Sequence, residues 1–373
     1  MQMYYISRIF GVLALTALGA AMWFAVVLGR ADAYFRKGAV ARAIEVTPRK
    51  IDYLALRALQ LDYEGQDSSA VTKRIAELTP LASAPRIKLG LAAELAGDPS
   101  NAERWLLDAA RVDRQFEPKW TLANFYFRAG NTPEFWKWMR AALTVSYGDR
   151  SPAFELCWRA SNDAVEILGA IPEQHDVLAT YLGFLSQTNR TAAMTTAARR
   201  LAALHEKADL PLFYGICDQL VAARDTSAAD VWQLAGEAAP HGVFNGSFEA
   251  APRNHGFDWR FAETAGVAHV DLSQAHRIVL NGRQPERAVL LAQTLNLAPG
   301  RYQLHWNART SDLNNGLEWR VSGARAALNS GALSFSAHGG FIELQLVYQR
   351  PLGEPRAEGS VELRGIEIVE DRP

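Results

Sequence analysis

The chain has 373 residues, enough for two or three domains of typical size. Hydrophobic residues make up 49% and charged residues 21%, a composition typical of a folded globular protein and not of a disordered one. The formal net charge is −1, and no run of lysines and arginines marks a basic surface, so no nucleic-acid partner is expected.

The chain opens with an uncharged apolar run, Ile9–Leu28, between Arg8 and Arg30. Twenty helical residues at about 1.5 Å each span a hydrocarbon core of about 30 Å. We therefore predict a transmembrane anchor with its flanks at residues 1–32. The segment Ala31-Asp32-Ala33 also matches a signal-peptide cleavage pattern, but a signal peptide has a shorter apolar region of about 7–15 residues.

The charges that flank this run bear on its orientation. Arg8 lies on one side, whereas Arg30, Arg36, Lys37 and Arg42 lie on the other. The positive-inside rule places the body of the chain in the cytoplasm. The C-terminal domain, described below, favours the opposite side instead. The hypothesis retained is a single-pass protein whose bulk is periplasmic or extracytoplasmic, with the orientation left open.

Residues 33–240 are rich in Ala and Leu and are predicted to be helical, with two consecutive units that repeat. Ala96-Gly97-Asp98 recurs 33 residues later as Ala129-Gly130-Asn131, and Trp105 recurs as Trp138 at the same offset. Each unit is expected to form one helix, a glycine-containing turn, a second helix and then a proline that ends it.

This pattern resembles the tetratricopeptide repeat family, whose period is close to 34 residues. The positions that carry the resemblance are Ala92, Gly97, Trp105, Ala109 and Pro118 in one unit, and Phe125, Gly130, Trp138, Ala142 and Pro152 in the next. The resemblance implies a helical solenoid with a concave surface that binds a partner protein. It does not indicate which residues make that contact.

Residues 241–373 change to short runs of alternating polarity separated by Gly, Pro and Asn. Apolar and polar residues alternate in Arg301–Arg309, Gly316–Ser322 and Phe341–Gln349. This period of two is typical of strands with one buried and one exposed face. The domain is therefore predicted to be an antiparallel β-sandwich, which makes the whole chain a multidomain α plus β protein.

Four stretches of this domain carry a second resemblance: Asn245–Glu249, Gly256–Arg260, Leu291–Leu295 with Pro299–Tyr302, and Val361–Val369. Their order resembles the jelly-roll carbohydrate-binding modules related to galactose-binding-like domains. That resemblance implies a jelly roll, polysaccharide as a ligand and Glu249 near a structural calcium. No other cofactor is expected.

A glycan site needs planar hydrogen-bonding groups and an aromatic platform. The alternation predicts one polar sheet face made by Gln303, His305, Asn307, Arg309, Glu318, Arg320, Glu343 and Gln345. Trp259 is the candidate platform, because Trp306 and Trp319 fall on the inward set. The competing interpretation is an ordinary solvated face, with Trp259 plugging one end of the sandwich.

The two cysteines, Cys157 and Cys217, lie in apolar helical stretches without metal-ligand spacing. They are predicted to be buried thiols, with a disulfide as the alternative.

Motifs of catalytic chemistry are missing from the sequence: it contains no GxxxxGK[ST], GxGxxG, HExxH or GxSxG motif. Glu318 and Glu343 could lie on neighbouring strands as the two acids of a glycoside hydrolase, but Arg309 and Arg320 offer them partners instead. We therefore predict a membrane-anchored, non-catalytic scaffold of cell-envelope polysaccharide biosynthesis or export. The alternatives are a scaffold that binds only proteins and a cryptic glycoside hydrolase.

Overall fold

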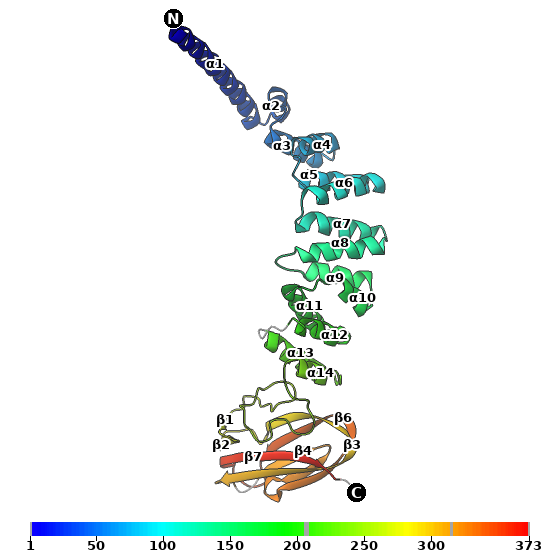
Figure 1. Ribbon diagram of the computed structural model, residues 1–373. Helices are drawn as coiled ribbons and strands as arrows, with labels where there is room; N and C mark the ends of the chain where they lie inside the picture. The colour runs from blue at the N-terminus through cyan, green and yellow to red at the C-terminus, as the bar shows by residue number, and fades with distance from the viewer. Residues whose placement is uncertain (1, 205–208, 314–315, 372–373) are drawn as a thin grey trace. The chain divides into compact units, whose positions relative to one another are not determined.

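The computed structural model describes residues 2–204, 209–313 and 316–371, with helices up to Leu234 and antiparallel strands from Val267 onward (Figure 1). This confirms the predicted α plus β class. The chain divides into two compact units, residues 1–162 with 170–172, and residues 163–169 with 173–373. The last helices thus belong to the same unit as the sheet.

The helices of the first unit are α1 (Gln2–Arg36), α2 (Val40–Val46), α3 (Ile51–Tyr63), α4 (Ser69–Leu78), α5 (Ala84–Leu95), α6 (Pro99–Val112), α7 (Phe116–Arg128), α8 (Thr132–Thr144) and α9 (Ser151–Ala160). Those of the second unit are α10 (Ala164–Ala170), α11 (His175–Gln187), α12 (Thr191–Ala202), α13 (Leu210–Ala222) and α14 (Ala228–Leu234).

Helix α1 is long and apolar, and its side chains from Leu13 to Val26 face solvent, whereas Ala31 near its end is buried. The stretch Leu13–Arg36 has the length and composition to cross a membrane. Trp23 and Phe24 are 70% and 65% exposed, which is unusual for large apolar side chains of a folded domain. The side chains of Ile9 and Phe10, at the start of the predicted anchor, lie outside the described ones.

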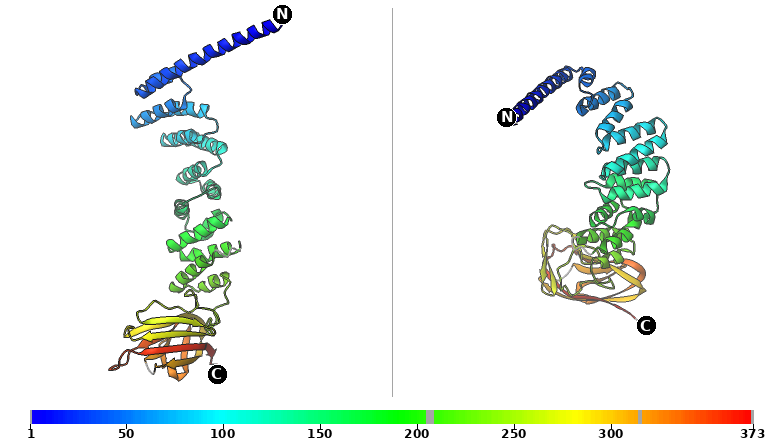
Figure 2. Two further views of the ribbon diagram at one scale, coloured as in Figure 1. Left: turned by 90° about the vertical axis from the view of Figure 1, so that its left-hand side faces the viewer. Right: turned by 45° about the horizontal axis from the view of Figure 1, so that its top comes forward.

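The two repeating units form the consecutive helix pairs α5/α6 and α7/α8, which lie side by side in Figures 1 and 2. Each turn has a glycine of positive φ, Gly97 at 78° and Gly130 at 69°. Asp98 and Asn131 then cap the second helix, because each accepts from the backbone amide of the third residue of that helix. The repeated tripeptide therefore ends one helix and starts the next.

The prolines act differently from the prediction, which had them end a unit. Pro118, Pro152 and Pro211 lie in the first turns of α7, α9 and α13. The first turn tolerates proline because its amides have no intrahelical partner. These prolines do mark the boundaries between repeats, but each lies at the start of the following helix and not at the end of the preceding one.

The strands are β1 (Val267–Leu272), β2 (Ala275–Asn281), β3 (Arg287–Ser311), β4 (Leu317–Val321), β5 (Ala324–Ala327), β6 (Ala332–Gln349) and β7 (Glu358–Glu370). They form one antiparallel seven-stranded sheet in the order β1-β2-β7-β3-β6-β4-β5.

The long strands β3 and β6 carry this sheet from one layer of the domain into the other. The bend lies where Pro299 and Gly300 of β3 pair with His338 and Ala337 of β6. The adjacent Gly339 has a φ of 92°, and an added Cβ there would lie 3.1 Å from the Pro299 ring. The half of β3 that follows the bend pairs with β7. The half of β6 that lies opposite the first half of β3 pairs with β4 on its other side. Side chains from both halves of β3, such as Leu295 and Leu304, meet in one core. The sheet thus folds over a shared apolar interior.

Candidate functional site

The outer face of β4 and β6 gathers four of the eight predicted polar residues. Arg320 lies opposite Gln345 in the register, and Glu318 forms an ion pair with Arg320. Arg320, Glu343 and Gln345 line a shallow pocket of about 580 Å³, together with Val321, Ser322, Gly323, Ala324 and Arg325. The pocket offers charged and neutral groups that can donate or accept hydrogen bonds, and its lining contains no aromatic residue.

The prediction of a single eight-residue face was wrong, because the sheet folds over. Gln303 and His305 lie in the other half of β3, opposite Val369 and Glu367 of β7. Asn307 and Arg309 follow them along the same strand. The alternation within each strand is correct, but the two groups point outward from different layers of one core.

Trp259 is not an exposed platform, so this prediction was also wrong. Its side chain is 0% exposed and packs against Phe248 and Trp319 in the core of the β domain. Its indole nitrogen donates a hydrogen bond to the Asn245 carbonyl at 3.1 Å. The competing interpretation, a tryptophan that plugs the sandwich, describes it correctly.

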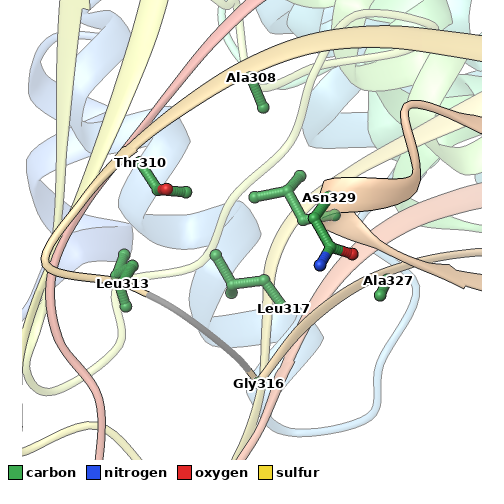
Figure 3. A pocket seen from close by; sticks show the side chains of 8 residues that line it. Ala308, Thr310, Leu313, Gly316, Leu317, Ala327 and Asn329 are labelled. Carbon is green, nitrogen blue, oxygen red and sulfur yellow. The ribbon is translucent and has the colours of Figure 1, made fainter.

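A second pocket, which the sequence did not suggest, lies between β3, β4 and the 3-10 helix Leu328–Ser330 (Figure 3). Its volume is about 330 Å³. Leu313, Leu317 and Leu328 form a buried apolar floor, and Thr310 and Asn329 lie exposed at the rim. All of its lining residues fall between Ala308 and Asn329, but they come from different elements, so the pocket forms only where β3, β4 and the 3-10 helix meet.

A histidine pair lies in the β1–β2 hairpin, with His276 fully buried and His269 partly buried. His276 shares a hydrogen bond of 2.9 Å with Asp271 through Nδ1, and its Nε2 lies 3.0 Å from Nδ1 of His269. Burial, followed by the neighbouring His276, lowers the pKa of His269 to about 4. Burial also lowers the pKa of His276, although Asp271 opposes the shift. Both imidazoles are therefore neutral at pH 7.

Glu249, the predicted calcium ligand, is exposed. Across residues 2–204, 209–313 and 316–371, no group of three His, Cys, Asp or Glu side chains is placed to hold a metal ion. Cys157 and Cys217 are buried free thiols, as predicted, and burial raises the pKa of each to about 12.

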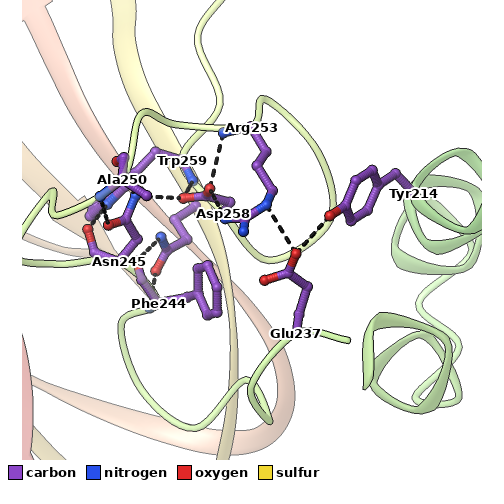
Figure 4. Close-up of polar contacts among 9 residues, drawn as sticks. Tyr214, Glu237, Phe244, Asn245, Ala250, Arg253, Asp258 and Trp259 are labelled. Carbon is purple, nitrogen blue, oxygen red and sulfur yellow. Dashed lines mark hydrogen bonds and ion pairs between the residues drawn. The ribbon is translucent and has the colours of Figure 1, made fainter. Parts of the chain in front are cut away.

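The β domain is joined to the last helix pair by an interlocked contact (Figure 4). Glu237, just after α14, accepts a hydrogen bond from the Tyr214 hydroxyl at 2.6 Å and pairs with Arg253 at 3.0 Å. Arg253 also reaches the fully buried Asp258, which accepts from the Arg253 backbone amide at 3.0 Å.

An aromatic cluster fills the interior of the same junction. Trp232 of α14 is 0% exposed and meets Phe244 and Phe257 edge-on. Gly256 allows this approach, because a Cβ there would lie 2.5 Å from the Trp232 ring. Asp218 of α13 accepts from the Gly256 amide at 2.6 Å. The strand-bearing domain is therefore fixed on α13 and α14.

A groove of the helical repeats is formed by α4, α5 and α6. Ala92 and Ala93 of α5 and Ala96 at its C-terminal cap line it, together with Trp105 of α6. The guanidinium of Arg104 lies 5.4 Å from the centre of the Trp105 ring. The volume of the groove is about 460 Å³.

Comparison with known proteins gives fold-level similarities alone. No family model matches the chain, and no curated protein matches it. Among solved structures, YrrB, a tetratricopeptide repeat protein with an unusual peptide-binding site, is 11% identical over 53% of this chain and 90% of its own, with a TM-score of 0.26.

Two further structures are similar in the same way. The C-terminal part of a tetratricopeptide repeat protein from Cytophaga hutchinsonii is 15% identical over 56% of this chain and 93% of its own, with a TM-score of 0.28. PilF from Pseudomonas aeruginosa is 13% identical over 57% and 92%, with a TM-score of 0.24. Scores this low carry no argument, so the repeat architecture rests on the chain's own helix pairs.

Proposed function

We propose that this protein is a membrane-anchored, non-catalytic scaffold of cell-envelope polysaccharide biosynthesis or export. The observation that carries the proposal is the junction of α13 and α14 with the β domain. Buried Trp232 and the Tyr214–Glu237–Arg253 contacts hold a ligand-presenting sheet on a helical repeat array. The sheet and the last repeat helices therefore belong to one unit of a chain whose first unit carries further repeats.

The anchor in this proposal is an uncleaved α1. The helix runs without a break through Ala31-Asp32-Ala33, and Ala31 is 0% exposed within a small core that includes Ala43 and Tyr53. The Tyr53 hydroxyl also donates to the Asp32 carboxylate. Cleavage after Ala33 would remove these contacts from the folded first unit. The full-length chain is expected in membrane fractions, and a soluble chain that starts at Tyr34 would contradict the anchor.

The body of the chain is proposed to lie on the extracytoplasmic side. A C-terminal alkaline phosphatase fusion should be active, and the matching fusion to a reporter that works only in the cytosol should be inactive. The reverse pattern would place the body in the cytoplasm, as the basic flank of α1 indicates.

Polysaccharide is proposed to bind the pocket on β4 and β6, where Arg320, Glu343 and Gln345 present planar hydrogen-bonding groups. The test is binding of the detergent-solubilised full chain to a broad glycan array and to purified envelope polysaccharide. Arg320→Ala should weaken binding by about tenfold, the cost of one charge-assisted hydrogen bond.

Arg309→Ala is the matched control, because Arg309 is an exposed arginine on the other layer of the same domain. It should leave glycan affinity unchanged, while both variants keep the unfolding midpoint of the parent. Absence of any glycan binding, or an equal loss in both variants, would remove polysaccharide from the proposal.

A scaffold that binds only proteins is the second candidate, and one observation favours it. The lining of the β4–β6 pocket has no aromatic residue on which a pyranose ring could stack, whereas its mixed charges suit a peptide. In that case the parent should bind no glycan on the array. Arg320→Ala should reduce capture of a protein partner from the envelope fraction.

A further inference from the structure

A cluster of cations follows the apolar part of α1. Between residues 30 and 50 there are six cations and two carboxylates, a net charge of +4 in a chain whose total is −1. All six cations are exposed: Arg30, Arg36, Lys37, Arg42, Arg49 and Lys50. We call these six residues the basic collar.

The collar belongs to a folded element and not to a loose linker. Phe35 of α1 stacks on Tyr53 of α3 with ring centres 4.6 Å apart, and Ala31 and Ala43 are fully buried beside them. Asp32, one of the two carboxylates, is engaged by the Tyr53 hydroxyl. The packing therefore fixes α2 and the start of α3, with their cations, against the end of α1.

The collar is also close to the end of the apolar helix. From Leu28 to Arg36 the helix rises about 12 Å, which is close to the screening length of about 8–10 Å at physiological ionic strength. Lys and Arg side chains at this depth reach the headgroup region.

We propose that the basic collar binds the phosphate groups of anionic phospholipids in the leaflet from which α1 emerges. The inference rests on the proposed membrane anchoring by α1. It assigns the collar one occupant, a lipid headgroup surface, through opposite charge and through continuity with the anchor. Lipid contacts would then hold α2 and α3 against the membrane surface.

The test uses the full chain with an environment-sensitive fluorophore on Ala41→Cys, an exposed position of α2. The native Cys157 and Cys217 are buried and are protected from the label. The labelled protein is placed in nanodiscs of phosphatidylcholine alone or of phosphatidylcholine mixed with phosphatidylglycerol. The emission should shift to the blue in the mixed discs, and high salt should diminish the shift.

The collar variant Lys37→Glu/Arg42→Glu/Arg49→Glu should lose this shift. The matched control Arg283→Glu/Arg287→Glu/Arg356→Glu reverses three exposed arginines of the β domain and should keep it. Circular dichroism should show equal helix content in all three proteins. If the collar variant alone loses helix, the salt dependence of the emission shift of the parent decides the test, and a shift that high salt does not diminish would overturn the inference.

The outcomes separate the two proposals. Failure of the parent to enter discs or to resist alkaline extraction from vesicles contradicts the anchor. Normal insertion with identical emission in both kinds of disc overturns the collar inference and leaves the anchor intact. A shift that occurs in neutral discs upon adding an acidic polysaccharide would make that polymer the occupant and overturn the lipid assignment.

Discussion

The helix pairs α7/α8 and α13/α14 differ in what covers them. The pair α7/α8 packs between other helices, and its Trp138 remains half-buried. The pair α13/α14 packs on the β domain, and its Trp232 is fully buried. A repeat at the end of an array exposes an apolar face that its neighbours would otherwise cover. Here the segment around Phe244 and Phe257 covers that face, so the β domain acts as the terminal cap.

The largest effect is expected at this cap. Trp232→Ala should lower the free energy of unfolding of the second unit by about 3–5 kcal/mol, because it removes a fully buried indole that touches helices and β domain alike. Denaturant unfolding followed by circular dichroism measures the change.

Trp138→Ala is the comparison variant within α8. Its indole is half-buried and donates to Glu134 at 3.1 Å, so we expect a loss of about 1 kcal/mol. Equal losses in the two variants would mean that the cap is no more tightly packed than an ordinary repeat.

Acid should destabilise the second unit more than the first, because the histidine pair lies in the β domain. The pKa of His269 is lowered from 6.5 to about 4 in the folded state, so the unfolded state binds more protons between these values. Stability of the second unit should therefore fall as the pH drops from 6.5 towards 4, by at most about 3 kcal/mol.

Thermal unfolding at a series of pH values tests this expectation. His269→Gln should remove most of the dependence between pH 6.5 and 4, because it removes the proton-binding group whose pKa is lowered to about 4. If the second unit of the parent unfolds at the same temperature across this range, the neutral state of the histidine pair is contradicted.

The smallest effects are expected at the caps of the repeated turns. Asp98→Ala should cost about 1 kcal/mol, because Asp98 accepts from the Asn101 amide at 3.1 Å. Asn131→Ala should cost less, since its bond to the Glu134 amide is 3.4 Å long. Helicity and unfolding midpoints of the two variants measure the order, and the reverse order would show that these bond lengths do not govern cap strength.

Local patterns predicted much of the fold from the sequence. Length and composition indicated α1, the repeated Gly97 and Gly130 turns indicated the helix pairs, and the period of two indicated the strands. These signals depend on neighbours in the chain, so they can be recognised without tertiary information. The prolines were correctly taken as repeat boundaries, but their role as the end of a helix was wrong. A proline that ends one repeat and a proline that begins the next occupy almost the same place in the sequence.

The candidate site was predicted in part, and the errors share one physical cause. Alternation places Gln303 and Arg320 outward on their own strands, but it does not say which strands share a layer. The bend at Pro299 and Gly339 decides that, and it separates the two residues. The prediction for Trp259 was wrong because its burial depends on packing against Phe248 and Trp319. The local alternation of polar and apolar residues does not reveal these contacts. The junction at Trp232 depends on the same kind of long-range packing.

Hydrogen exchange of the full chain in detergent tests most directly whether the β domain and the last helix pair form one body. Amides of α13, α14 and the central strands β3 and β6 should open together with a common free energy, and Trp232→Ala should lower that free energy for all of them at once. If α13 and α14 instead exchange with α7 and α8 while the strands stay protected, the β domain is a separate module and the scaffold proposed here is contradicted.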